Sequence, residues 1–146
     1  MNILVINGPN LNLLGIREKE IYGEATHDDL EKFLHAEAKK LGVRIDVFQT
    51  NHEGAIIDKI HEAYRRKFSG IILNPGAYTH YSYAIRDAIK AVDLPVVEVH
   101  LSDLESRENF RKVSVIREVC DAVFMGKGFL SYREALEHLV VSHADQ

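Results

Sequence analysis

The sequence has a single cysteine, no long apolar run and no surplus of basic residues, and each absence excludes a class of protein. Cys120 alone can form no internal disulfide, and no cysteine spacing typical of a metal site is present. No stretch approaches the length that crosses a bilayer. A net charge of −4 without a basic cluster offers no surface for nucleic acid or a membrane. We therefore expect a cytoplasmic protein that binds neither.

The bulk composition is that of an ordinary globular domain. The chain has 146 residues, of which 46% are hydrophobic and 27% are charged. This length fits one domain with one core, and we expect it to span residues 1–146. The start, MNILVING, lacks the charged lead and cleavage site of a signal peptide. The last residues, about 142–146, predict a short polar tail.

Short apolar runs alternate with helical patterns, which indicates a parallel α/β sheet. The runs are rich in Val and Ile and predict strands buried on both faces, at residues 3–6, 43–48, 70–73, 96–99 and 122–125. The pattern predicts a flavodoxin-like three-layer sandwich with a five-stranded parallel sheet in the order 2-1-3-4-5.

Capping signals mark the limits of two of the predicted helices. Thr26, with Asp29 three residues later, predicts the start of the first long helix, and Gly42 predicts its end. Ser131 with Glu134 predicts a capping box at the start of the last helix. A shorter helix is expected within residues 107–120.

Polar side chains follow four of the predicted strands. In an open parallel sheet, ligands bind beyond the carboxyl ends of the strands, near the point where the strand order reverses. The side chains expected at this edge are Asn7, Asn10, Gln49, Asn51, His52, Glu53, Asn74, His80, Glu98, His100 and Ser102. Any single Asn or Ser there can be a helix cap, but four loops with amides and imidazoles together predict a site.

The sequence lacks the motifs of several common kinds of site. No G-x-x-x-x-G-K-[ST] or G-x-G-x-x-G spacing is present for a phosphate or a dinucleotide. Glu98 and His100 face the same way on a strand, but no third ligand completes a recognisable zinc set, so we expect no metal. The G-x-S-x-G motif of a serine nucleophile is also missing. What remains is acid–base chemistry on an anionic substrate.

A long irregular segment, NGPNLNLLGIREKEIYG, follows the first strand and carries one Arg and one Tyr. A phenol of ordinary pKa, about 10, is only about 0.1% ionised at neutral pH and is a poor base. A neighbouring Arg17 could stabilise the phenolate of Tyr22 if the segment folds back on itself. The residues alone leave a second interpretation open, in which Tyr22 packs under the loop and Arg17 is a solvated surface charge.

At this point the motifs match a known family. NGPNLNLLGIRE, FQTNHEG, LNPGAYTHYSYAIRDAI, VVEVHLSD and RENFR occur in one order over nearly the whole chain. Together they resemble type II 3-dehydroquinate dehydratase. The resemblance implies conversion of 3-dehydroquinate to 3-dehydroshikimate and water by anti elimination through an enolate, without a cofactor. That reaction serves aromatic amino acid biosynthesis through the shikimate pathway, or quinate breakdown.

The resemblance also implies roles for individual residues. Tyr22 would be the base and His100 the acid, assisted by Arg17, by Asn10 through a bound water, and by Glu98. The substrate would be held by Asn74, His80, Arg111, Leu101 and Ser102, with Arg107 and Gly76 in support. Asp87 would reach the substrate of a neighbouring subunit in a homo-oligomer, a dodecamer built from trimers. Residues of about 15–23 would form a closing lid, with Gly15 and Gly23 as hinges.

A few positions depart from the family pattern as the resemblance defines it: Lys19, Tyr81, Tyr83, Asp103, Leu104 and Glu105. Two other interpretations of the sequence stay open. One is a flavodoxin-like module that binds a small ligand at the same edge without catalysis. The other is a lyase or hydrolase that acts on a different small acid, because Asp103 and Glu105 add negative charge near the site.

Overall fold

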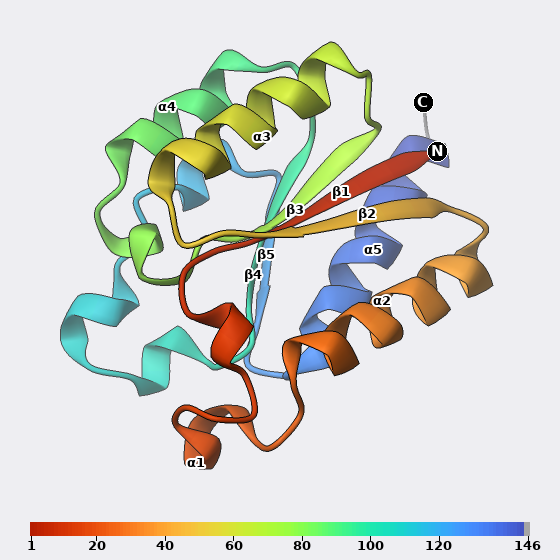
Figure 1. Ribbon diagram of the computed structural model, residues 1–146. Coiled ribbons are helices and arrows are strands. Elements are labelled where there is room, and N and C mark those ends of the chain that lie inside the picture. Colours follow the sequence, from red (N-terminus) through yellow and green to blue (C-terminus); the bar gives the residue numbers. More distant parts are fainter. Residues whose placement is uncertain (145–146) are drawn as a thin grey trace.

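The computed structural model describes residues 1–144 and consists of a parallel sheet between two pairs of helices (Figure 1). The strands are β1 (Asn2–Asn7), β2 (Arg44–Gln49), β3 (Gly70–Asn74), β4 (Val96–His100) and β5 (Ala122–Met125). All neighbouring strands pair in parallel, in the order β2-β1-β3-β4-β5. The predicted flavodoxin-like topology is confirmed.

The helices that cover the sheet are α2 (His27–Leu41), α3 (Glu53–Arg65), α4 (Tyr83–Ala91) and α5 (Phe129–Ala144). Helices α3 and α4 lie on one face of the sheet, and α2 and α5 lie on the other (Figure 1). Each pair closes its own apolar layer, because strand side chains alternate between the two faces. No helix within residues 1–144 is long and apolar enough to cross a membrane.

Burial differs between the central strands and the edge strands. Strands β3 and β4 are buried along their whole length, and β1 is buried except at Asn2. The prediction that all five strands are buried on both faces is wrong for β2 and β5. Arg44 and Asp46 of β2 are exposed, and all four residues of β5 are only partly buried. The sheet ends at these strands, so each lacks a covering neighbour on one side.

The cap predicted for α2 is present. The Thr26 hydroxyl accepts from the backbone N–H of Asp29 at 3.1 Å, and the Asp29 carboxylate accepts from the N–H of Thr26 at 2.9 Å. This reciprocal pair satisfies two backbone donors at the helix start and lowers the pKa of the Asp29 carboxyl. Gly42 ends the helix in the left-handed conformation, with φ 71°.

Two predictions about the second half of the chain are wrong. Helix α5 begins at Phe129, so Ser131 lies inside it, and the Ser131 hydroxyl accepts from the N–H of Lys127. Glu134 pairs instead with the Lys127 ammonium at 2.6 Å. The helix predicted within 107–120 is replaced by 3₁₀ turns at Asn109–Lys112 and Arg117–Val119, which follow another such turn at Leu104–Ser106. Of the polar tail predicted at about 142–146, residues 142–144 belong to α5, and residues 145–146 lie outside the described part.

Candidate active site

The candidate site lies at the carboxyl ends of β1, β3 and β4, where the loops after these strands gather (Figure 1). A cavity of about 120 Å³ opens there. It is lined by Pro9, Asn10, Leu11, Arg17, Tyr22, Asn74, Gly76, Ala77, His80, His100, Leu101, Ser102, Leu104, Arg107 and Arg111. Strand order reverses between β1 and β3, so the cavity is where an open parallel sheet binds ligands.

The structure brings most of the predicted site residues to this cavity. Two of them do not line it. Glu98 lies behind His100 and is fully buried, and Asp87 is exposed on α4 outside the lining. Of the other edge residues, Gln49 and Asn51 brace the loop after β1. The Gln49 amide donates to the Gly8 carbonyl at 3.1 Å, and the Asn51 side chain accepts from the N–H of Asn10 at 3.0 Å.

On one side of the cavity, His100 and Glu98 form a buried pair on β4. The His100 Nε2 and the Glu98 Oε2 are 2.6 Å apart, and the two residues are 5% and 0% exposed. The other Glu98 oxygen accepts from the Ser114 hydroxyl at 3.0 Å, and the Arg117 guanidinium lies 3.4 Å from Oε2. The carboxylate therefore has a partner on both oxygens, as a buried charge requires.

These partners decide the charge of Glu98. Burial alone would raise the pKa of its carboxyl, but the His100 hydrogen bond and charge, with Arg117 and Ser114, hold that pKa below its ordinary value. The imidazole thus has a permanent anion behind it and presents its second nitrogen, Nδ1, for other partners. Sequence reasoning missed Ser114 and Arg117, because nothing in the spacing of a long β4–β5 connection indicates where it folds back.

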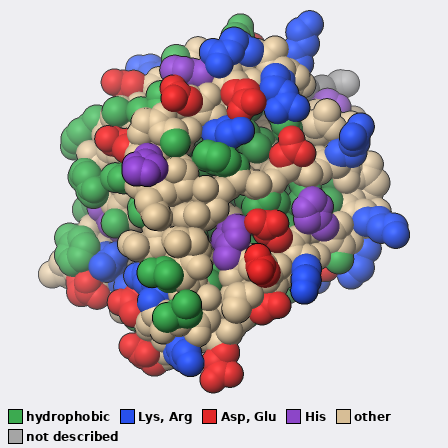
Figure 2. All heavy atoms as spheres, viewed as in Figure 1, with side chains coloured by type: hydrophobic (Ala, Val, Ile, Leu, Met, Phe, Trp, Pro, Cys, Tyr) green, Lys and Arg blue, Asp and Glu red, His purple; other side chains and the backbone are tan. Residues whose placement is uncertain are grey.

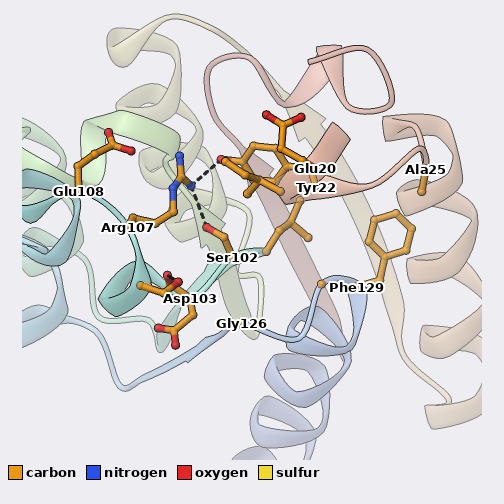
Figure 3. Close-up of a pocket in the computed structure, with 13 residues that line it drawn as sticks. Glu20, Tyr22, Ala25, Ser102, Asp103, Arg107, Glu108, Gly126 and Phe129 are labelled. Atoms are coloured by element: carbon orange, nitrogen blue, oxygen red, sulfur yellow. Dashed lines mark hydrogen bonds between the residues drawn. The ribbon is translucent and has the colours of Figure 1, made fainter. Parts of the chain in front are cut away.

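On the opposite side, Tyr22 lies at the end of the short helix α1 (Lys19–Tyr22), between two arginines. Its phenolic oxygen accepts from the Arg107 guanidinium at 3.1 Å, as the dashed line in Figure 3 marks. The Arg17 guanidinium carbon lies 5.0 Å from the centre of the Tyr22 ring, and that guanidinium also pairs with Glu18 at 2.8 Å. The segment does fold back as required, but the hydrogen bond to the phenol comes from Arg107.

The Tyr22–Arg107 contact also affects the pKa of the arginine. Burial would lower the pKa of Arg107, but the hydrogen bond and charge interaction with Tyr22, together with Glu18 and Glu108, hold it above its usual range. Arg107 also donates to the Ser102 hydroxyl at 3.1 Å (Figure 3). The guanidinium is therefore fixed between the α1 segment and the loop after β4.

The floor and rim of the cavity carry further polar groups. The Asn74 side-chain oxygen accepts from the N–H of Gly76 at 3.2 Å, and Gly76 has a φ of 60° that glycine adopts without strain. His80 Nδ1 lies 2.7 Å from the Val113 carbonyl, so this nitrogen carries the hydrogen. Burial lowers the pKa of His80 against the raising effect of that carbonyl, and the charges of His100 and Arg111 lower it further. A neutral His80 is then a hydrogen-bond acceptor through Nε2.

A second, wider hollow of about 840 Å³ adjoins the cavity and shares Tyr22, Leu101, Ser102 and Arg107 with it. Figure 3 shows it between the α1 segment, the loop after β4 and the start of α5 near Phe129. Asp103, one of the departures from the family pattern, lines this hollow. Its carboxylate accepts from the N–H of Glu105 at 3.0 Å, so it caps a 3₁₀ turn.

The segment 15–23 has the backbone geometry of a tight excursion. Gly15 and Gly23 have φ values of 88° and 78°, and Glu18 also has a positive φ of 41°. A Cβ on Gly15 would lie 2.8 Å from the Glu24 carbonyl oxygen, whereas one on Gly23 would meet nothing within 4 Å. The segment is thus packed closely at its first glycine and open at its second.

The surface outside the cavity was compared with what a polyanion or a metal ion would need. On the face shown in Figure 2, acidic and basic side chains are interspersed without a broad patch of one sign. Within residues 1–144, no group of three or more His, Cys, Asp or Glu side chains is arranged to hold a metal ion. Cys120 is half-buried, and burial raises the pKa of its thiol to about 12, which makes it a poor nucleophile.

The fold and this site define a flavodoxin-like α/β protein whose cavity is lined by Tyr22, His100 and three arginines. Comparison with known proteins narrows that class. The model of the family described as dehydroquinase class II matches residues 1–140. The chain is 58% identical to a 3-dehydroquinate dehydratase of Caldicellulosiruptor bescii, with 92% of each chain covered. It is 52% identical to the 3-dehydroquinate dehydratase of Thermotoga maritima, over 95% of this chain and 94% of that one.

A comparison with solved structures supports the same family. The type II dehydroquinase of Butyrivibrio crossotus superposes with a TM-score of 0.94 at 51% identity, over 95% of this chain and 97% of that one. The chain belongs to the class II dehydroquinase family. The resemblance noted in the sequence is confirmed over nearly its whole length.

Proposed function

We propose that this protein is a 3-dehydroquinate dehydratase that eliminates water from 3-dehydroquinate through an enolate. The observation that carries the proposal is the placement of Tyr22 and His100 on one cavity, each with a charged partner of the sign that its role requires. The family membership and the two relatives named 3-dehydroquinate dehydratase support the same reaction.

Tyr22 removes the proton next to the ketone in this proposal. The phenolate that must form is stabilised by the Arg107 hydrogen bond and by Arg17 near the ring. A charge-assisted hydrogen bond of this kind is worth about 1.5–3 kcal/mol. Asn10, at the rim, holds the water that hydrogen-bonds to the enolate oxygen.

His100 protonates the departing hydroxyl. The ionised Glu98 carboxylate accepts a hydrogen bond from the His100 ring and so orients the imidazole that delivers the proton into the cavity. The remaining contacts fall to the groups that line the cavity. Asn74, neutral His80 and the Leu101–Ser102 segment bind substrate hydroxyls, and the Arg111 guanidinium attracts the carboxylate.

Segment 15–23 acts as the lid in this scheme. It carries both Arg17 and Tyr22, and it is attached to the body through glycines at positive φ. An enolate is protonated by stray water, so a segment that closes over the cavity protects the intermediate and positions the base together.

The proposal also includes a homo-oligomeric assembly. Asp87 is exposed on α4 and does not line the cavity of its own chain, as a residue that serves a neighbouring subunit would. Four large apolar side chains close in sequence to the site residues His80 and Arg111 are each more than half exposed: Tyr81, Tyr83, Phe110 and Val113. Exposed large apolar side chains of this kind support a homo-oligomer, for which we propose a dodecamer in the cytoplasm. Sedimentation of the purified protein as a monomer would contradict it.

One assay tests the function directly. The product contains an enone conjugated with a ring carboxylate, which absorbs ultraviolet light that the substrate does not. Micromolar protein mixed with 3-dehydroquinate should produce this absorbance, and addition of EDTA should not reduce it. Absence of any signal would reject the proposal and favour a module that binds a small ligand at this edge without catalysis.

A further inference from the structure

A chain of polar side chains runs from the cavity floor to the start of α2, on the face of the sheet that α2 and α5 cover. The Asn74 side-chain nitrogen donates to the Tyr132 hydroxyl at 3.0 Å, and that hydroxyl donates to the Asn7 side-chain oxygen at 2.7 Å. The Asn7 side-chain nitrogen lies 3.1 Å from His27 Nε2. Asn7 and Tyr132 are 0% exposed and Asn74 is 3% exposed.

The bonds can be assigned one consistent direction. The N–H of Gly76 occupies the Asn74 oxygen, so the Asn74 amide nitrogen must face Tyr132. The phenol then accepts from Asn74 and donates to Asn7. The Asn7 nitrogen can only donate, so His27 Nε2 accepts, and His27 Nδ1 lies 3.4 Å from the Glu31 carboxylate.

Each member of the chain fixes the orientation of the next. Rotation of the Asn74 amide by half a turn would put its nitrogen against the N–H of Gly76, so two donors would face each other. It would also put its oxygen at the phenol, whose hydrogen is already used by Asn7. A buried donor without a partner costs about 1–3 kcal/mol, so the rotated amide is disfavoured from both ends.

The hydroxyl of Tyr132 has no evident role in packing. The ring is enclosed by the apolar layer between α2, α5 and the sheet, where a phenylalanine ring would fill the same space. Burial raises the pKa of the phenol, so the hydroxyl stays protonated and remains a donor to Asn7. A fully buried hydroxyl in an apolar layer is costly unless it is hydrogen-bonded, and both partners of this hydroxyl are the side-chain amides of Asn74 and Asn7.

We propose that Tyr132 and Asn7 are positioning residues that lock the Asn74 amide with its second N–H directed to the substrate. Neither residue lines the cavity, so both act through Asn74. Because Asn74 would bind ground state and transition state alike, the lock affects substrate binding more than turnover. The inference rests on the proposed function, since its kinetic test uses the dehydratase reaction.

The test is Tyr132→Phe in the full-length enzyme. The variant should raise KM for 3-dehydroquinate about tenfold, the effect of losing one well-placed hydrogen bond, and leave kcat within about twofold. Leu136→Ala is the matched control on the same helix. It removes a fully buried side chain and destabilises the same layer, yet it should leave KM unchanged. An unchanged KM in Tyr132→Phe, or an equal rise in the control, would overturn the proposal.

A double-mutant cycle separates positioning from general structural damage. In an Asn74→Ala background, Tyr132→Phe should have no further effect on KM, because the group it positions is gone. Additive effects would show that Tyr132 acts by another route and would overturn the proposal. If Tyr132→Phe does not fold, Asn7→Ser, which withdraws the acceptor of the phenol, is measured in the same cycle and judged by the same two outcomes.

A spectroscopic measurement keeps the inference independent of the reaction. In ¹⁵N-labelled enzyme without substrate, the side-chain NH₂ of Asn74, identified by its loss in Asn74→Ala, should exchange slowly with solvent and exchange faster in Tyr132→Phe. Unchanged exchange would overturn the relay. If the wild-type enzyme does not dehydrate 3-dehydroquinate, the proposed function fails, and this exchange measurement still decides the positioning role.

Discussion

The two sides of the cavity hold their reacting groups in different ways. On the acid side, Glu98 and His100 belong to one buried strand, and their mutual orientation is set by the period of two along β4. On the base side, Tyr22 belongs to a four-residue helix on an exposed segment and reaches its partner Arg107 across 85 residues of sequence. The acid is organised by the sheet itself, whereas the base depends on where segment 15–23 lies.

Because of this difference, one side of the site is fixed before the substrate binds and the other side must move. The Glu98–His100 pair is in place before the substrate binds, because buried side chains that are hydrogen-bonded to each other have little freedom to move. The base must be delivered, because the segment that carries it also has to let the substrate enter. Changes on the acid side should therefore alter both stability and chemistry, and changes on the base side should alter chemistry alone.

The largest effect is expected for Tyr22→Phe. The substitution keeps the ring between Arg17 and Arg107 and removes only the phenolic oxygen, so kcat should fall at least about 10³-fold with little change in KM. Melting temperature should be unchanged, because the residue is only partly buried on the segment. Tyr64→Phe, an exposed tyrosine on α3, is the control and should keep full activity. Turnover near that of the wild type in Tyr22→Phe would show that another group removes the proton.

The acid side should respond in two measurable ways. His100→Ala should lower kcat about 10²-fold, while His35→Ala on the exposed surface of α2 should not. Glu98→Gln should lower kcat less, about tenfold, and should also reduce the free energy of unfolding by about 1–3 kcal/mol at pH 7. Full activity in His100→Ala would mean that the hydroxyl leaves without acid help.

The stability effect of Glu98→Gln should depend on pH. The pKa of the Glu98 carboxyl is lowered from 4.5 in the folded protein, so its ionised form stabilises the fold above about that pH. This contribution is lost as pH falls through the lowered folded value. Denaturant unfolding of the two proteins should therefore show a difference that is constant at neutral pH and shrinks below about pH 4.5. A difference that grows on acidification would contradict the assigned charge.

The two arginines near Tyr22 should differ in importance. Arg107→Met removes the hydrogen bond to the phenol, so it should lower kcat at pH 7 about 10- to 100-fold. Arg17→Met removes a cation 5.0 Å from the ring centre and should cost about 3- to 10-fold. Arg65→Met on α3 is the control. The reverse order of effects would show that Arg17 replaces Arg107 at the phenol when the substrate is bound.

The sequence predicts the central part of this structure well and the connections poorly. Apolar runs located all five strands because β-branched residues in short runs have few alternatives, and the strand ends then placed Asn74, Glu98 and His100 at one edge. The Thr26–Asp29 cap was readable because it is a local pair. The Ser131–Glu134 pair has the same spacing, but α5 begins two residues before Ser131, and both side chains contact Lys127 instead of capping the helix.

Long-range partners are what local patterns could not supply. The Arg107–Tyr22 bond and the Ser114 and Arg117 contacts to Glu98 depend on how the loop between β4 and β5 turns back over the sheet. That loop forms three 3₁₀ turns in place of the predicted helix, and no periodicity specifies their path. The Tyr132 relay was hidden for the same reason, because it joins three elements that are far apart in the sequence.

The smallest effect is expected for Gly23→Ala, which tests segment 15–23 separately from the rest of the molecule. Gly23 has φ 78° and ψ −166°, a conformation that only glycine adopts easily, yet a Cβ there would touch nothing within 4 Å. Gly23→Ala should therefore strain the segment without disturbing any neighbour, lowering kcat a few-fold while the unfolding transition of the sheet and helices stays unchanged. Gly42→Ala is the matched control, since it too has a positive φ and open surroundings but lies at the far end of α2. It should lower the free energy of unfolding by about 1 kcal/mol and leave kcat unchanged. Equal kinetic effects of the two variants would mean that the position of Tyr22 is set by the whole fold and that the base side is as rigid as the acid side.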